Sequence, residues 1–184
     1  AVLAIALTSV LFTALFTVGG SMLTTFEEST FRQIGTSAHG WYKYLSMEEY
    51  EKIKAAGGYK AIAYDIVAGF GASPELNTIQ TEVRYSEDMA AKWGYCYPEK
   101  GKMPREMNEC AASSKVLEAL GVPLKVGEKV PISIRIADKD GVEKTVDEEF
   151  VLSGFWYSNE ASHAEEFWIS KEWLLANVSI LDEN

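Results

Sequence analysis

The chain has 184 residues, with 27 acidic and 17 basic side chains and a net charge of −10. This length suits one domain of ordinary size, alone or with a membrane segment. The acidic balance excludes a chain built to bind nucleic acid and disfavours adhesion to anionic lipid, since both require a basic surface.

The chain opens with an uninterrupted apolar run. Residues 1–26 contain no charged residue and no histidine, and ~20 residues cross a bilayer as a helix that rises ~1.5 Å per residue. A secretory signal peptide usually has a shorter apolar core and a small-residue cleavage site, which Gly19-Gly20-Ser21 could imitate. We therefore predict a transmembrane helix, with a signal peptide and a buried core helix as alternatives. Because the run is already under way at Ala1, we expect a fragment or a processed form.

Three small polar residues lie on one side of this predicted helix. Ser9, Thr13 and Thr17 recur every four residues, and a stripe of small residues lets transmembrane helices approach closely. We therefore expect the helix to pack in a bundle through these residues. A lone membrane anchor is the alternative.

The residues after the apolar run indicate its orientation. Glu27 and Glu28 follow it, and the first basic residue is Arg32. Cytoplasmic flanks are usually rich in Lys and Arg, so this end is predicted to lie outside the cell. We assign residues 1–35 to a transmembrane helix that continues as a stalk, and residues 36–184 to an extracytoplasmic domain.

Capping patterns predict four short helices after the stalk. Ser46 and Glu49 have the spacing of a capping box, and Gly57-Gly58 stops that helix. The other three are predicted to begin at Ser86, Ser113 and Ser170, and the first two of these to end at Gly94 and Gly121.

Alternating apolar residues predict strands between these helices. The predicted strands cover 62–70, 78–85, 130–136, 142–157 and 167–169. Pro131 is expected to place its strand at a sheet edge. Asp138–Gly141 has the sequence of a hairpin turn and lacks the later ligands of a calcium loop. Strands mixed with short helices, without regular βαβ alternation, indicate an α+β fold.

The two cysteines enclose a turn-rich segment. Cys96 and Cys110 could form a disulfide, worth about 3 kcal/mol if the geometry permits, or could be two buried free thiols. The segment between them is predicted to separate two subdomains, the second at about 96–165.

Most aromatic residues are expected to be core residues, with a ligand groove as the alternative. They are Trp41, Tyr42, Tyr44, Phe155, Trp156, Tyr157, Phe167, Trp168 and Trp173. A partner surface near Tyr95 and Tyr97 is a further possibility.

The sequence contains no catalytic or metal-binding motif. His39 and His163 are far apart, and neither a nucleophile elbow nor a phosphate-binding glycine loop occurs. We expect no catalytic residue, no bound metal and no cofactor in this chain.

Several strings of the chain together resemble the FtsX/MacB-like permeases of ABC transporters. They are the apolar helix with its stalk, a strand–helix–strand unit formed by Trp41–Tyr44, Ser46–Ala56 and Ile62–Phe70, and the strings Glu99–Pro104, Asn108–Ala112, Val116–Gly121 and Leu124–Lys129. The residues that match the turns of the family are Gly101, Pro104, Asn108, Glu109, Gly121 and Gly127. Glu128 departs from the family, which often has Asp there. The resemblance implies a domain like the MacB periplasmic core.

This resemblance implies a permease subunit in a bacterial cell membrane that passes several times through the bilayer. The implied partners are a cytoplasmic ATPase subunit that hydrolyses the ATP, a second permease copy or homologue, and a peptide, lipoprotein or drug-like substrate. The stalk would transmit ATP-driven movement to the outer domain. A single-span sensor or ligand-binding domain is the alternative, and a secreted hydrolase ranks third.

Overall fold

The computed structural model describes residues 2–137, 142–158 and 164–178. The helices are α1 (Val2–Ile34), α2 (Met47–Ala56), α3 (Asp88–Trp93), α4 (Ser114–Ala119) and α5 (Lys171–Asn177), with a 3₁₀ turn at Pro74–Leu76. The strands are β1 (Asp65–Gly71), β2 (Thr81–Ser86), β3 (Lys100–Gly101), β4 (Glu109–Ser113), β5 (Lys129–Ala137), β6 (Glu143–Trp156) and β7 (Glu165–Ile169). A long apolar helix followed by a mixed domain confirms the α+β prediction.

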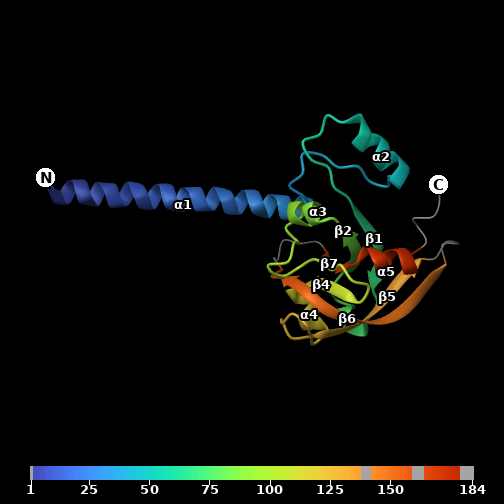
Figure 1. The fold of residues 1–184 in the computed structure, drawn as a ribbon. Coiled ribbons are helices and arrows are strands. Elements are labelled where there is room, and N and C mark those ends of the chain that lie inside the picture. The colour runs from blue at the N-terminus through green and yellow to red at the C-terminus, as the bar shows by residue number, and fades with distance from the viewer. Residues whose placement is uncertain (1, 138–141, 159–163, 179–184) are drawn as a thin grey trace.

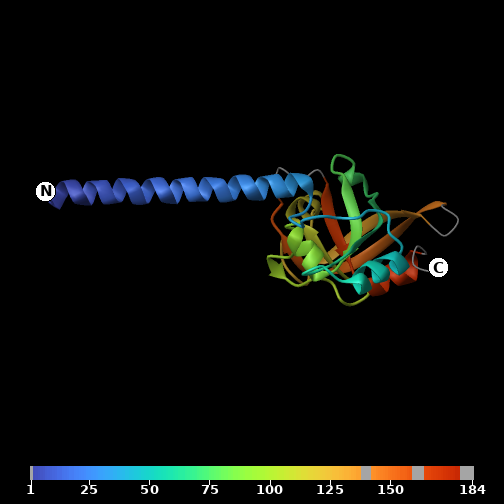
Figure 2. The ribbon, with the colours of Figure 1, turned by 90° about the horizontal axis from the view of Figure 1, so that it is seen from above.

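Helix α1 projects from the rest of the molecule as a single rod (Figures 1 and 2). It is long and apolar enough to cross a membrane, and none of its most apolar stretch is buried by the rest of the described chain. Its large apolar side chains up to Leu23 are 56–83% exposed. A helix that is apolar on all sides and covered by nothing is suited to lipid rather than to water.

The strands form one sheet that closes on itself. Neighbouring strands follow the order β6–β4–β7–β2–β1–β5, and β5 pairs again with β6. The short strand β3 adds to β6 on the other side. The pairs β2–β7 and β4–β6 are parallel, and the other pairs are antiparallel. The domain is therefore a small six-stranded barrel, to which strands on both sides of residue 96 contribute.

The interior of the barrel is the main hydrophobic core. On β5 the alternation that predicted the strand is confirmed, because every second residue from Val130 to Ile136 is at most 3% exposed. Phe150 lies against both Phe167 and Trp173, with ring centroids 5.6 and 5.9 Å apart. Through its ring contact with Phe150, Trp173 packs helix α5 against strand β6.

A second, smaller core lies on the outer face of the barrel. It consists of Ala91, Cys96, Met103, Ala111, Trp156 and Trp168, with Tyr97 packed against it. Residues of β4 alternate between the two cores, so Ala111 faces outward whereas Cys110 and Ala112 face the interior. This outer core fixes α3 and the segment after it to the sheet.

Three of the four predicted helix caps are confirmed. The Ser46 side chain and Glu49 form a complete capping box on α2, and Gly57 follows the helix. Ser113 and Ser170 accept hydrogen bonds from the backbone N–H groups of Val116 and Trp173. The fourth prediction is off by one residue, because α3 begins after Glu87. Ser86 ends β2 instead, and its hydroxyl donates to the Glu87 carbonyl.

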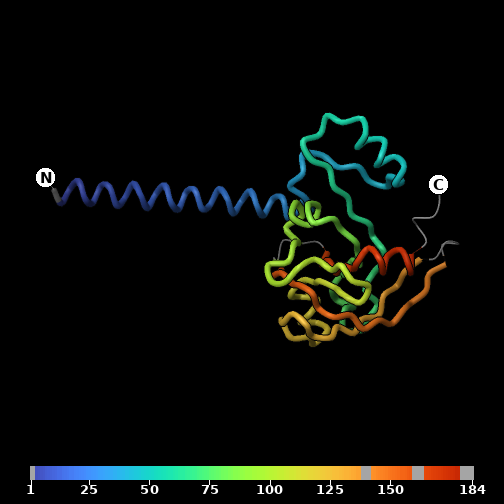
Figure 3. The backbone as a smooth tube through the Cα atoms, viewed as in Figure 1, coloured from blue at the N-terminus to red at the C-terminus, as the bar shows by residue number. Residues whose placement is uncertain are grey.

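Residues 38–63, called the arm here, stand away from the barrel (Figures 1 and 3). The predicted strand at 41–44 is wrong, since this segment has no strand partner. The strand predicted from Ile62 begins only at Asp65. Trp41, Tyr42 and Tyr44 are 56%, 66% and 100% exposed, and Tyr157 is also exposed, so these four do not belong to the core. The other five aromatic residues expected in the core are buried: Phe155, Trp156, Phe167, Trp168 and Trp173. The family resemblance implied a strand at 41–44, but this segment pairs with no strand of the described chain.

Pro131 does not lie on an edge strand. Strand β5 pairs with β6 along its length and with β1 at Ile134–Ile136. Ser133, two residues on, directs its N–H to the Ser73 hydroxyl, away from β6. By the two-residue period of a strand, the Pro131 nitrogen points the same way and removes no hydrogen bond to β6.

Two sequence predictions fall on residues that the structure does not describe. The hairpin turn at 138–141 lies outside the described residues, although β5 and β6 pair up to Ala137 and Glu143. His163 is also outside them, whereas His39 is an exposed residue of the arm.

Candidate functional site: the joint between the apolar helix and the barrel

The end of α1 is held against the barrel by one arginine. The Arg32 side chain is 15% exposed and donates to the Tyr95 carbonyl across 3.3 Å. Its guanidinium lies 5.0 Å from the centre of the Tyr95 ring. Glu28, one turn earlier on α1, accepts two hydrogen bonds from the same guanidinium at 2.7 and 3.0 Å. A planar guanidinium can make these contacts simultaneously, and Glu28 balances its charge.

A second set of hydrogen bonds fastens the chain just after α1. The helix ends at Gly35, whose N–H donates to the Phe31 carbonyl and whose φ of +87° suits glycine. Two residues later, the backbone N–H and the hydroxyl of Ser37 both donate to the Trp93 carbonyl at the end of α3, at 2.8 and 3.1 Å. We call the Glu28–Arg32 pair, together with the contacts of Arg32 with Tyr95 and of Ser37 with Trp93, the stalk joint.

The turn that receives Arg32 has an unusual backbone. Tyr95 has a φ of +57°, a left-handed conformation that costs a non-glycine residue roughly 1–2 kcal/mol. The turn is held by backbone hydrogen bonds from Tyr95 to Lys92 and from Cys96 to Ala91, at 3.1 and 2.9 Å. Strained residues persist where their surroundings fix them, and here the turn presents both the Tyr95 carbonyl and the Tyr95 ring to Arg32.

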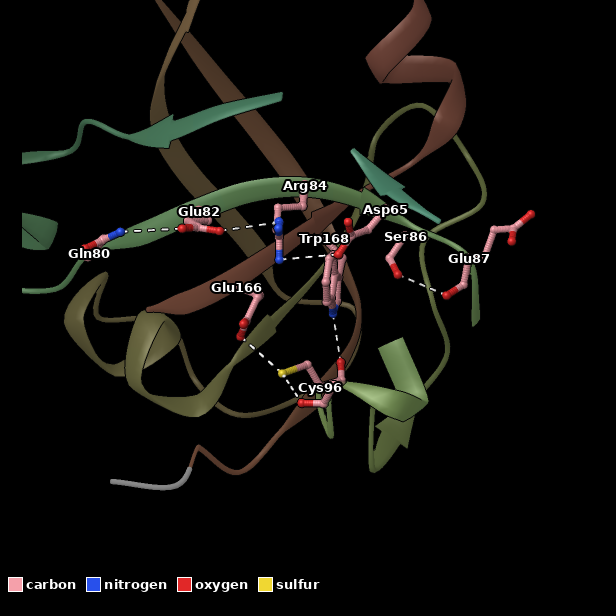
Figure 4. A network of polar contacts seen from close by, with 10 residues as sticks. Asp65, Gln80, Glu82, Arg84, Ser86, Glu87, Cys96, Glu166 and Trp168 are labelled. Carbon is pink, nitrogen blue, oxygen red and sulfur yellow. Dashed lines mark hydrogen bonds and ion pairs between the residues drawn. The ribbon is translucent and has the colours of Figure 1, made fainter. Parts of the chain in front are cut away.

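Beneath this turn, Cys96 connects the joint to strand β7 (Figure 4). The Cys96 thiol lies 3.2 Å from a carboxylate oxygen of Glu166 and 3.1 Å from the Gly94 carbonyl. The Trp168 indole donates to the Cys96 carbonyl across 2.8 Å. Cys96 is therefore held through its side chain and its backbone by two residues of one strand.

Burial dominates the protonation of the groups under the joint. It raises the pKa of the Glu166 carboxyl to about 7, opposed by the Cys96 thiol and by the positive charge of Arg84. It also raises the pKa of the Cys96 thiol, an effect strengthened by Glu166, so this thiol stays protonated at neutral pH.

Arg84 of β2 lies beside Glu166 on the same outer face (Figure 4). Its guanidinium is 3.4 Å from both Asp65 and Glu82. The Arg84 Nε atom is buried and makes no hydrogen bond, although it lies within ion-pairing distance of Glu82. These ion pairs connect β1 with β2, and the positive charge of Arg84 acts on Glu166 of β7.

The cysteines lie on opposite faces of the sheet. Both are free buried thiols, Cys96 in the outer core and Cys110 in the barrel interior. Of the two alternatives that the sequence left open, the structure has the free thiols. Burial raises the pKa of the Cys110 thiol as well, so neither cysteine is an activated nucleophile at neutral pH.

The residues of the family-like turns serve the framework of the barrel. Gly101 has a φ of +81° and packs against the backbone of β6, and Pro104 is buried. The Asn108 carbonyl accepts from the Val151 N–H, and Glu109 closes the loop before β4 by accepting two backbone N–H groups and pairing with Lys102. Gly121 and Gly127 also have positive φ values. None of these residues contacts the stalk joint.

The stripe predicted to pack against other helices lies on the exposed part of α1. Ser9, Thr13 and Thr17 line a shallow groove together with Val10, Ala14 and Val18. The Thr13 hydroxyl donates to the Ser9 carbonyl one turn earlier, so its hydrogen-bonding capacity is partly met within the helix. Packing against another transmembrane helix stays a prediction for these three residues.

The sequence reasoning missed the residues that form the joint. Arg32 was read only as a marker of orientation, although it is the first basic residue after the apolar run. Glu166 stands between buried residues in Glu165–Ile169, and an acidic residue in such a strand could have signalled a partly buried carboxyl. In the described part of the chain, no group of three or more His, Cys, Asp or Glu residues is arranged to hold a metal.

Comparison with known proteins gives little guidance. No protein-family model matches the chain, and no curated protein matches it. Among solved structures, one similar chain is a domain of a protein named as a permease, from Porphyromonas gingivalis. The two share 14% sequence identity with a TM-score of 0.41, over 64% of this chain and 52% of the other. The chain thus spans about half the length of that domain.

Proposed function

We propose that this chain is the first transmembrane helix and the extracytoplasmic domain of an ABC transporter permease of the FtsX/MacB-like kind. The observation that carries the proposal is α1, a continuous apolar helix fastened by Arg32 to a folded barrel. From Leu3 to Phe26 the helix is ~36 Å long, enough for a hydrocarbon core of ~30 Å. The remaining turns to Ile34 add ~12 Å, which holds the barrel clear of the bilayer.

The chemistry of the joint suits mechanical coupling. Arg32 forms a charge-assisted hydrogen bond and a cation–π contact, worth roughly 1.5–3 and 0.5–1 kcal/mol respectively. Together with the Ser37 hydrogen bonds, these contacts would make α1 and the barrel move as one rigid unit when the displacement is small. A tilt of α1 within the membrane would then displace the barrel by rigid-body motion.

The remaining parts of the proposal come from the resemblance and the charge pattern. Glu27 and Glu28 at the end of the apolar stretch favour the outside of the cell for the barrel, because cytoplasmic flanks are usually basic. ATP would be hydrolysed by a cytoplasmic ATPase subunit, and a second permease copy or homologue would complete the pore. The substrate class extends to peptides, lipoproteins and drug-like molecules, and this domain performs no bond chemistry on them.

A purification and a distance measurement test the proposal together. The full-length protein is purified in mild detergent from its native membranes, and the ATPase activity that accompanies it is measured. A spin label is then placed at Tyr44→Cys, a fully exposed site on the arm, and distances between the two copies are recorded with ADP and with trapped ATP. We expect a co-purifying ATPase and a distance distribution that changes with the nucleotide.

The variant Thr25→Pro separates coupling from assembly. Proline in a helix interior removes a hydrogen bond and kinks the helix, so ATP hydrolysis should continue while the distance change at the arm is lost. Thr25→Ala is the matched control and should behave as the wild type. If no ATPase accompanies the protein, the permease proposal fails and a single-span sensor becomes the better account.

A further inference from the structure

The arm is attached to the rest of the molecule through the two ends of one short helix, α3. Just before the arm, the backbone N–H and the hydroxyl of Ser37 donate to the Trp93 carbonyl at the end of α3. Just after the arm, the Tyr64 carbonyl accepts from the Glu87 N–H across 3.1 Å, and the Tyr64 N–H donates to the Glu87 carboxylate across 3.3 Å. Glu87 directly precedes α3. The arm is therefore a loop whose base is closed by α3.

Tyr64 also connects this base to the helix of the arm. Tyr50, the buried residue of α2, packs edge-on against the Tyr64 ring, with ring centroids 4.9 Å apart. The Tyr64 side chain further contacts the Tyr85 ring of β2 at 5.8 Å and accepts a hydrogen bond from Lys171 of α5 at 3.2 Å. These two contacts with the barrel oppose a displacement of Tyr64, so any effect that α3 has on the arm is expected to be partial.

The stalk joint holds the other end of the same helix. The Trp93 carbonyl receives Ser37, and two residues further on the Tyr95 carbonyl receives Arg32. The Tyr95 N–H donates back to the Lys92 carbonyl of α3 across 3.1 Å. The turn that binds Arg32 is thus hydrogen-bonded to α3, and a displacement of Arg32 acts on that helix.

Helix α3 has few attachments of its own to the barrel. Of its six residues only Ala91 is buried. Asp88 pairs with Arg105, but exposed ion pairs of this kind contribute little. Hydrogen bonds connect the two ends of the helix, because the Ala91 N–H donates to the Glu87 carbonyl and the Ala91 carbonyl accepts from the N–H of Cys96. A small shift of α3 as one rigid piece would therefore reach both ends at once.

We propose that α3 is a coupling element between the stalk joint and the far end of the arm. A displacement of α1 changes the position of the arm through α3, and a force on the arm acts on α1 by the same route. The arm stands away from the barrel (Figure 1), so it is the part of the domain through which such a movement can reach another molecule. The proposal concerns α1, α3 and the arm alone and does not depend on whether the chain belongs to a transporter.

Hydrogen exchange tests the coupling from the side of the stalk. The full-length protein in nanodiscs is compared with Arg32→Ala, and exchange of the Tyr64 and Glu87 amides is followed. Arg32 contacts neither residue, and the substitution leaves the intrinsic exchange rates of these distant amides unchanged. We expect both amides to exchange about two- to fivefold faster in the variant, the effect of a weak energetic coupling.

The reciprocal experiment starts from the arm. Glu87→Ala removes the carboxylate that accepts from the Tyr64 N–H. Because coupling between two sites is reciprocal, exchange of the Ser37 amide should become faster by a similar factor. Glu87→Gln keeps an acceptor oxygen at this position and is the matched control, in which Ser37 should exchange as in the wild type.

A glycine in α3 tests whether this helix is the route. Ala90→Gly loosens α3, because glycine weakens a helix, and it removes no side chain of the stalk joint or of the arm. In this background the effect of Arg32→Ala on the Tyr64 amide should largely disappear. Ala55→Gly makes the same change at an exposed site on α2 and should leave the effect intact.

The proposal is overturned if Arg32→Ala leaves the Tyr64 and Glu87 amides unchanged, or if Glu87→Ala leaves the Ser37 amide unchanged. It is also overturned if Ala90→Gly and Ala55→Gly alter the effect equally, because α3 would then not be the element that transmits it.

Discussion

Arg32 is a single basic side chain placed where an apolar helix meets a folded domain. It is largely buried, pairs with Glu28 on its own helix and reaches Tyr95 on the barrel. Most ion pairs of the domain are exposed and contribute little. Arg32 differs from them because it joins two parts of the molecule. It pairs with Glu28 on α1 and donates to the backbone carbonyl of Tyr95 in the domain.

The first prediction concerns this arginine. In Arg32→Ala the Tyr95 carbonyl loses a charge-assisted hydrogen bond, worth roughly 1.5–3 kcal/mol. Protection of the Ser37 amide from hydrogen exchange should fall by about tenfold or more, while the barrel stays folded. Arg105→Ala is the control, because Arg105 pairs with Asp88 on the surface with 63% of its side chain exposed. Equal protection of Ser37 in the two variants would rule out Arg32 as the residue that fastens α1.

Gly101 allows a second prediction at the same scale. It has a φ of +81°, and an added Cβ would lie 2.1 Å from the Ser153 carbonyl oxygen of β6. Gly121 has a similar φ of +68° but open space around it. Gly121→Ala should therefore cost only the backbone penalty of roughly 1–2 kcal/mol. Gly101→Ala should cost at least 1 kcal/mol more, because two backbone segments must separate.

Denaturant unfolding, monitored by tryptophan fluorescence, measures both glycine variants. Similar losses in the two would mean that the backbone of β3 and β6 can move apart without strain. Gly101 was identified from its match to a family turn, whereas its close approach to β6 follows only from the structure.

For single residues, the sequence predicts interactions within one helix better than contacts between residues that are distant in the chain. Ser46, Ser113 and Ser170 act within their own helices, so their roles could be predicted from spacing alone. Cys96 and Cys110 could not be resolved in this way, because their separation depends on which face of β4 each residue approaches. The environment of Glu166 is set by Cys96 and by Arg84 of β2, which approach it only in the folded domain.

The same holds for helices and strands, whose local patterns were predictable from the sequence whereas their arrangement in the sheet was not. The inward residues of β5 were predicted correctly because alternation is a local property of a strand. Strand order was not predicted, and the closure of the barrel depends on pairing between β1, β5 and β6. Pro131 is an example. Proline is usual on edge strands, and the sequence does not reveal that β5 has a second neighbour, β1.

The cap of α5 provides the prediction at this scale. Ser170 is fully buried and caps a helix whose Trp173 and Leu174 fill the barrel. Ser170→Ala should reduce the free energy of unfolding by about 1 kcal/mol or more, up to about 2. This loss would lower Tm by roughly 2–8 °C for a domain of this size.

Ser46→Ala is the matched control for Ser170→Ala. It removes a cap of the same type from α2, which lies on the arm away from the barrel (Figure 1). Helix α2 should fray while the Tm of the barrel stays within about 1 °C, because that helix contributes little to the barrel core. Scanning calorimetry distinguishes the two, and equal shifts would show that the arm and the barrel unfold as one unit.

The whole molecule combines two parts suited to different surroundings. Residues 1–26 carry no charge at all, and all 27 acidic and 17 basic residues follow them. Helix α1 is exposed along its apolar length, whereas the barrel has its own core and an acidic surface. The sequence predicted this division because composition decides it, while the joint between the parts could be seen only in three dimensions.

The central claim is that α1 crosses the membrane and carries the barrel on the outer side. Labelling of Tyr44→Cys in intact spheroplasts with a membrane-impermeant maleimide tests it most directly. Tyr44 is fully exposed, whereas Cys96 and Cys110 are 8% and 0% exposed and give little background. Ser9→Cys, within the apolar stretch, is the control that should stay unlabelled. The claim predicts full labelling of Tyr44→Cys before permeabilisation, and labelling only after permeabilisation would contradict it.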